Sequence, residues 1–63
     1  MLELDELLQT FLEREYDALP GDQQAAFRRL LEEGDQDLFR WLFERPDSAP
    51  PRHAPILRRL RRG

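Results

Sequence analysis

The stretch ELDELLQTFLEREYDAL, residues 3–19, decides the fold class of this chain. Its apolar side chains recur at intervals of one, three and four residues, at Leu4, Leu7, Leu8, Phe11, Leu12, Tyr16 and Leu19. This spacing is typical of one face of an α-helix. We therefore predict an amphipathic helix over residues 3–19. We expect Glu3 or Asp5 to stabilise its first turn, because negative charge at a helix N-terminus interacts favourably with the helix dipole.

A second and a third helix follow, separated by proline and glycine signals. Pro20 ends the first helix, and the second runs over about residues 22–33. Gly34 is a natural left-handed cap at its end, and Asp35 is a good N-cap for a third helix over residues 36–45. The apolar side chains of the third helix cover more than half of its surface, which exceeds what two neighbouring helices need: Leu38, Phe39, Trp41, Leu42 and Phe43.

The C-terminal part of the chain is richer in proline and arginine. Residues 46–54 form a proline-rich connector that we expect to be extended. A last helix over about residues 55–62 carries Ile56, Leu57 and Leu60 on one side, and residues 58–63 form a basic tail. The prediction is an all-α fold, a small bundle of about four short helices in one domain spanning residues 1–63.

The charge is divided unevenly along the 63 residues. Residues 1–50 hold all 13 acidic residues and five of the ten arginines, a charge of −8, whereas residues 51–63 carry +5. An acidic body is not typical of a nucleic-acid-binding domain. No apolar run approaches the roughly 20 residues of a membrane span. We therefore expect a soluble cytoplasmic protein that has neither a membrane span nor a nucleic-acid partner.

The residues that usually carry catalysis or bind metals are scarce. The chain has no cysteine, and its one histidine, His53, has no second histidine to help hold a metal. Ser48 lies in the connector, with no rigid element to set it against His53 as a nucleophile and base require. We expect no catalytic, metal or cofactor site. We also expect His53 to be solvated, in the connector or early in the last helix, and Glu32 and Glu33 to lie on a solvated acidic face.

Three residues are predicted to have structural roles. Glu15 falls on the apolar side of the first helix, where a carboxylate needs a polar partner. We therefore expect it either to cap a neighbouring helix or to lie at the wet edge of the bundle. Tyr16 and Trp41 are expected in the core, where their O–H and N–H need partners. Phe39 and Phe43 are the surplus aromatics of the third helix, and if exposed they form an interaction patch.

The sequence also resembles a known family. The pattern ELDxxLxxFLEREYDxL, followed by FxxLLEEGDQDLFRWL, resembles the SdhE (YgfY) family of succinate dehydrogenase flavinylation factors over about residues 1–43, without gaps. The matching residues are Glu3, Leu4, Asp5, Phe11, Glu13, Glu15, Tyr16, Asp17, Leu19, Phe27, Leu30, Leu31, Asp35, Asp37, Leu38, Trp41 and Leu42.

The resemblance implies an assembly factor and not an enzyme. Members are small helical bundles that bind the flavoprotein subunit of succinate dehydrogenase, or of fumarate reductase, and promote covalent attachment of FAD to a histidine of that subunit. By this resemblance the partner carries the FAD, and this chain binds no cofactor stably.

The chain departs from the family at its first residues. The family signature is R-G-x-x-E followed by L-D. Here Met1 and Leu2 take the x positions and Glu3 supplies the Glu, while the Arg-Gly and the helix before it are not in this sequence. The first helix here then corresponds to the second of a five-helix family fold. The resemblance makes Glu3 the expected partner contact, within a docking face formed by Glu3, Asp5, Asp35, Asp37, Phe39 and Phe43.

Other functions remain open from the sequence. The chain could be an antitoxin-like or adaptor module without a role in flavinylation. An apolar arc left bare by the absent helix could stay wet, repack or drive formation of a homodimer. At about 25 cal/mol per Å², exposing roughly 200 Å² forfeits about 5 kcal/mol, which is comparable to the total stability of many small domains.

Overall fold

The computed structural model describes residues 2–62, and within that range the chain forms helices and turns with no strand. The four α-helices are α1 (Leu2–Arg14), α2 (Gly21–Leu30), α3 (Asp35–Phe39) and α4 (Ala54–Arg62). A single π-helical turn, η2 (Arg40–Glu44), continues α3. The predicted all-α fold is confirmed. Met1, Gly63 and the side chain of Arg62 lie outside what is described, so the predicted basic tail is seen only in part.

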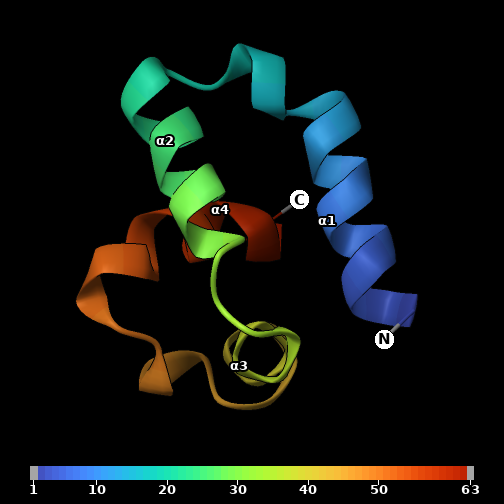
Figure 1. Ribbon diagram of the computed structural model, residues 1–63, viewed down its shortest axis with the longest axis vertical. Coiled ribbons are helices and arrows are strands. Elements are labelled where there is room, and N and C mark those ends of the chain that lie inside the picture. The colour runs from blue at the N-terminus through green and yellow to red at the C-terminus, as the bar shows by residue number, and fades with distance from the viewer. Residues whose placement is uncertain (1, 63) are drawn as a thin grey trace.

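The helices surround a shared core. In Figure 1, α1 and α2 stand on opposite sides of the view and are joined at the top, while α3 is seen end-on at the bottom. The last helix, α4, lies behind α2 and contacts α1, α2 and η2. The buried apolar residues come from all of these elements and form one cluster: Leu4, Phe11, Leu19, Phe27, Leu30, Leu38, Trp41, Leu42, Ile56, Leu57 and Leu60.

The first helix is shorter than predicted. It ends at Arg14, and residues Tyr16–Ala18 form a 3-10 turn instead of continuing the α-helix. Pro20 prevents the helix from continuing through Leu19, because a proline disfavours helical backbone in the residue before it. Leu19 is accordingly extended, with φ −74° and ψ 143°. Its side chain is buried in the core despite the loss of helix.

The predicted caps between α2 and α3 are wrong. Gly34 has φ −70° and ψ 154°, so it is not a left-handed cap, and Gly34 rather than Asp35 occupies the N-cap position of α3. The reason is that α2 ends at Leu30, before the predicted end at residue 33. At the end of the helix, the amide of Glu32 donates to Arg29 O at 3.2 Å, and the amide of Glu33 donates to Leu30 O at 3.0 Å. These 3-10-type bonds satisfy carbonyls at the helix end, and the turn needs no left-handed residue.

The predicted third helix is present but changes type part-way. The amide of Arg45 donates to Arg40 O at 2.5 Å, a bond across five residues that widens the last turn. Pro46 follows and cannot donate an amide to extend the helix. The wide turn leaves Trp41 and Leu42 buried, while Phe43 is 46% exposed. π-turns of this kind are frequent at functional sites.

The connector is not extended as predicted. It contains two 3-10 turns, Pro46–Ser48 and Pro51–His53, each with proline at its first position. A proline at this position costs no hydrogen bond, because the first amides of a helical turn have no acceptor within the turn. The Ser48 hydroxyl donates to Arg45 O at 2.7 Å, which ties the first turn together. The turns shorten the connector and bring α4 back across the bundle.

Leu30→Ala tests how strongly the core depends on complete burial. Leu30 is 0% exposed, and a buried Leu→Ala change costs about 2–5 kcal/mol. We expect the variant to be largely unfolded or to have a much lower urea midpoint by far-UV circular dichroism. Leu2→Ala is the matched control: Leu2 is 69% exposed, so stability should change by less than about 0.5 kcal/mol. Equal effects of the two changes would contradict the described core.

Candidate functional site

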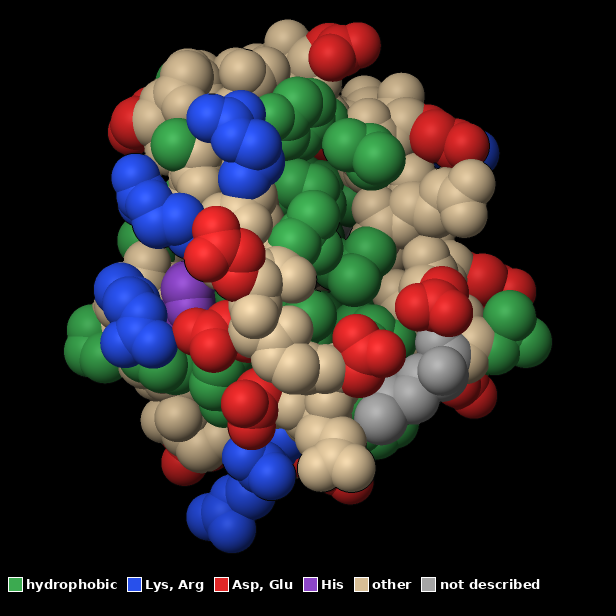
Figure 2. Space-filling model, viewed as in Figure 1, with side chains coloured by type: hydrophobic (Ala, Val, Ile, Leu, Met, Phe, Trp, Pro, Cys, Tyr) green, Lys and Arg blue, Asp and Glu red, His purple; other side chains and the backbone are tan. Residues whose placement is uncertain are grey.

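Two acidic helix starts belong to neighbouring elements. Glu3 and Asp5 lie in the first turn of α1, and Asp35 and Asp37 lie in the first turn of α3. The helices α1 and α3 contact one another. Glu3, Asp5 and Asp35 are exposed and Asp37 is partly exposed, so the two helix starts place acidic side chains on the surface. Acidic side chains gather in the lower half of the face in Figure 2, where these helices start.

Phe39 and Phe43 add an aromatic component beside the acidic helix start of α3. Their ring centroids are 4.9 Å apart with planes at 40°. Phe39 packs against the core, whereas Phe43 is 46% exposed. Aromatic anchors carry much of the energy in protein interfaces. The six residues of the predicted docking face are called the acidic–aromatic patch below: Glu3, Asp5, Asp35, Asp37, Phe39 and Phe43.

An ion pair lies within this region. Arg40 Nη1 is 3.1 Å from Asp37 Oδ1, and both side chains are nearly half exposed. A surface pair one helical turn apart contributes at most about 1 kcal/mol. The pair is therefore weak enough that a partner protein can replace it with its own contact to Arg40 or to Asp37.

Tyr16 and Trp41 pack against or within the core. The Tyr16 hydroxyl accepts a bond from Arg28 Nη1 at 2.6 Å, and its ring centroid lies 5.7 Å from that of Phe27. Trp41 is buried with its ring centroid 5.7 Å from that of His53. Both aromatics therefore join separate elements, which is consistent with structural roles.

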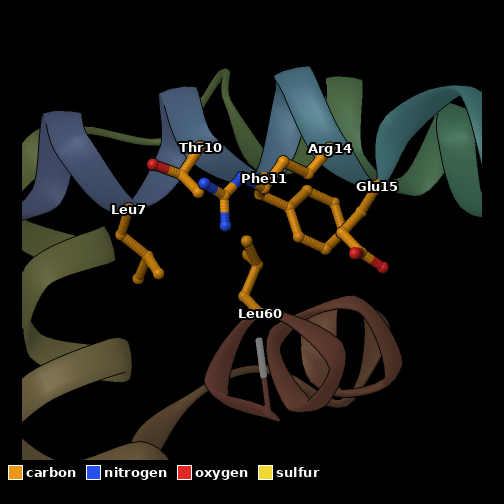
Figure 3. Close-up of a pocket in the computed structure, with 6 residues that line it drawn as sticks. All are labelled: Leu7, Thr10, Phe11, Arg14, Glu15 and Leu60. Carbon is orange, nitrogen blue, oxygen red and sulfur yellow. The ribbon is translucent and has the colours of Figure 1, made fainter.

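Glu15 lies at the wet edge of the bundle, one of the two alternatives left by the sequence. It is exposed at the rim of a small pocket of about 100 Å³ between α1 and α4. Figure 3 shows Leu60 reaching from α4 toward Leu7 and Phe11 on α1, with Glu15 beside the Phe11 ring. The pocket is too small for a cofactor, since such sites enclose about 300–1,000 Å³.

His53 corrects the prediction of a solvated histidine. It is only 3% exposed, and its Nε2 lies 2.6 Å from Glu33 Oε2. Arg52 Nη2 donates to the same oxygen at 3.1 Å. Glu33 is half-buried, so the prediction of a fully solvated acidic face is wrong at this residue, while Glu32 is exposed as expected. The three side chains Glu33, Arg52 and His53 are called the Glu33 clasp below.

The Glu33 clasp controls the protonation of its carboxylate. The hydrogen bond from His53, followed by that from Arg52, holds the pKa of Glu33 below its ordinary value of 4.5. Both donors favour the ionised form of the carboxylate. The clasp fastens the end of α2 to the residues directly before α4.

The sequence held a signal for the buried histidine that was overlooked. His53, Ile56, Leu57 and Leu60 follow the spacing i, i+3, i+4, i+7, so the histidine extends the apolar face of the last helix by one turn. Glu33 had no such signal, because it lies 20 residues away and only folding brings the pair together. The Ser48 hydroxyl donates to Arg45 O, and Nε2 of His53 lies against Glu33, so the two side chains have different partners.

Across the described range 2–62, no three His, Cys, Asp or Glu side chains are grouped so that they could hold a metal ion. None of the helices in that range combines the length and the hydropathy needed to cross a membrane.

Comparison with known proteins identifies the family of the chain. The profile of the family described as "Flavinator of succinate dehydrogenase" matches residues 1–63. The chain belongs to this family. The "FAD assembly factor SdhE" of Pseudomonas aeruginosa is 44% identical over 61 residues, which cover 97% of this chain and 69% of that relative.

Two further relatives of the same name support the assignment. The one from Photobacterium profundum is 38% identical over 60 residues, covering 95% of this chain and 68% of the relative. The one from Idiomarina loihiensis is 51% identical over 41 residues, covering 65% of this chain and 46% of the relative. No solved structure matches. The relatives are named as assembly factors and not as catalysts, which agrees with the prediction that the chain is not an enzyme.

The Glu33 clasp predicts a specific pH dependence. Because the pKa of Glu33 is lowered on folding, the unfolded chain binds more protons near pH 4, and acid removes this stabilisation. The stability difference between the unaltered chain and Glu33→Gln should be full at neutral pH and shrink as pH falls below 4.5. Urea unfolding at several pH values measures it.

The adjacent residue supplies the control. Glu32→Gln removes an exposed carboxylate from the next position along the chain. We expect its stability difference from the unaltered chain to be small and to vary little with pH. A difference for Glu33→Gln that stays constant or grows in acid would contradict the clasp.

Proposed function

We propose that this chain is an assembly factor that binds the flavoprotein subunit of succinate dehydrogenase, or of fumarate reductase, and promotes covalent attachment of FAD to it. The observation that carries the proposal is the family match over residues 1–63, together with relatives named FAD assembly factors. The chain spans about two thirds or less of the length of those relatives. The activity and the partner are therefore proposed for this chain.

In this proposal the chain acts by direct contact with the flavoprotein. The acidic–aromatic patch docks on the flavoprotein through the carboxylates of α1 and α3 and the exposed Phe43 ring. Charged groups around an aromatic anchor fit the usual anatomy of protein interfaces, in which the anchor is buried and the rim is polar. Docking favours the flavoprotein conformation that holds FAD close to its acceptor histidine, and such gains in orientation can be large.

In this proposal FAD stays on the partner. A cavity of about 470 Å³ has Asp5 and Glu13 among its lining residues. Carboxylates there disfavour the diphosphate of FAD by like-charge repulsion. The residues present do not fit the cofactor, and this chain supplies no bond-forming atom.

Glu3→Gln tests the docking face. Glu3 lies exposed in the first turn of α1 and holds the position of the family's signature glutamate. We expect co-purification with the flavoprotein subunit to weaken by about tenfold or more, as for a hot-spot residue. The covalent flavin fluorescence of the denatured flavoprotein band should fall in a strain that lacks its own assembly factor. Glu6→Gln, which removes another exposed carboxylate from α1, should leave both readouts unchanged.

Phe43→Ala tests the aromatic part separately. Because Phe43 is nearly half exposed, the change should cost little stability but weaken flavoprotein binding. Arg45→Ala, an exposed position shortly after it, is the control. If the unaltered chain neither binds the flavoprotein nor raises flavin fluorescence, the proposed function is wrong. Capture of a toxin by the unaltered chain would then favour the antitoxin-like alternative.

A further inference from the structure

A second surface shares Asp5 with the acidic–aromatic patch but has neither Phe39 nor Phe43 on its lining. A groove of about 470 Å³ runs between α1 and α2 and has an apolar floor formed by Leu8, Leu12, Phe27 and Leu31. Figure 2 shows hydrophobic side chains gathered in the hollow between these two helices. Leu12 is 49% exposed and Leu31 45% exposed. Leu12 on α1 and Leu31, directly after α2, are thus large aliphatic side chains left in water in one groove, and apolar surface exposed in this way is typical of interaction sites.

The groove face of α1 is distinct from its core face. Leu4 and Phe11 point into the core and are buried. The groove is lined instead by residues that recur at helical spacing on a neighbouring face: Asp5, Leu8, Gln9, Leu12 and Glu13. The helix α1 therefore carries more apolar surface than the bundle uses.

Charge on the groove rim selects the kind of occupant. Asp5 and Glu13 line the α1 side, and Gln9 Nε2 donates to Glu13 Oε2 at 3.4 Å. On the other side, the lining residues Phe27 and Leu31 are uncharged. The acidic rim repels lipid and nucleic-acid phosphates and attracts cations. Two copies of this chain meeting at the groove would bring like charges together, which disfavours a homodimer at this surface.

The length of the groove suits a short helix. From Asp5 to Glu13, α1 rises about 12 Å, or about two turns. Amphipathic helices bind such grooves through apolar anchors at i, i+3, i+4 and i+7. We propose that the groove between α1 and α2 binds an amphipathic helical segment of a partner protein, with apolar anchors on the floor and lysine or arginine facing Asp5 and Glu13. This inference does not rest on the flavoprotein assignment.

Two synthetic peptides test the proposal. Each is a helix of about 14 residues with leucine at four positions spaced three and four apart, as groove-binding helices present them. One carries lysine at the flanking positions and its twin carries glutamate. We expect the lysine peptide to bind the full chain with 1:1 stoichiometry in fluorescence anisotropy, about tenfold or more tighter than its twin. Binding should weaken as salt rises from about 50 to 300 mM, because the rim charges are exposed.

Matched variants locate the binding. Leu12→Glu puts a charge on the groove floor and should abolish binding of the lysine peptide, while Leu2→Glu alters a more exposed leucine outside the groove and should not. Circular dichroism confirms that each variant is folded. Equal binding of both peptides, no binding, or binding that survives Leu12→Glu would overturn the proposal. So would a dimer of the free chain in sedimentation that Leu12→Glu dissociates, since the groove would then hold a second copy.

Discussion

Burial of one face of α4 is the interaction on which the rest of the structure depends. Ile56, Leu57 and Leu60 are each at most 1% exposed, and α4 contacts α1, α2 and η2. Burying an aliphatic side chain of this size contributes about 1.5–3 kcal/mol. A 63-residue chain buries only about 60% of its unfolded surface, so its margin of stability is small. The last helix therefore stabilises the others by supplying a common surface for them.

The Glu33 clasp belongs to the same arrangement. His53 occupies the position one turn before the buried face of α4, where an apolar residue would serve packing alone. Its bond to Glu33 instead gives the connector a fixed attachment to the end of α2. A buried polar group is tolerated when it is hydrogen-bonded, and here a charged acceptor strengthens the bond. Packing and polar contacts together determine where the proline-rich connector lies.

Because the core takes the inner faces of the helices, function is left to the outer ones. The acidic helix starts, the Phe43 ring and the groove leucines all face outward. The described part of the chain brings together charged and apolar side chains suited to contact with another protein, in keeping with a family of assembly factors. The acidic–aromatic patch and the groove share Asp5, but the patch has aromatic side chains of α3 and η2 where the groove has the aliphatic side chains of Leu8, Leu12 and Leu31.

The sequence by itself determined the all-α class, the apolar faces and the family, because helical periodicity and the order of motif residues are local properties of the chain. The stripe of Leu38, Trp41 and Leu42 is buried, whereas in the second stripe Phe39 packs against the core and Phe43 is exposed, a difference that spacing left open. Only the tertiary structure decided the shorter α1, the cap at Gly34, the π-turn and the bond from His53 to Glu33. The bond from His53 to Glu33 joins residues 20 positions apart, and no local pattern specifies which distant partner satisfies a polar group. The shorter α1, the cap at Gly34 and the π-turn rest on local backbone geometry, and the apolar pattern does not specify which type of helical turn the backbone adopts.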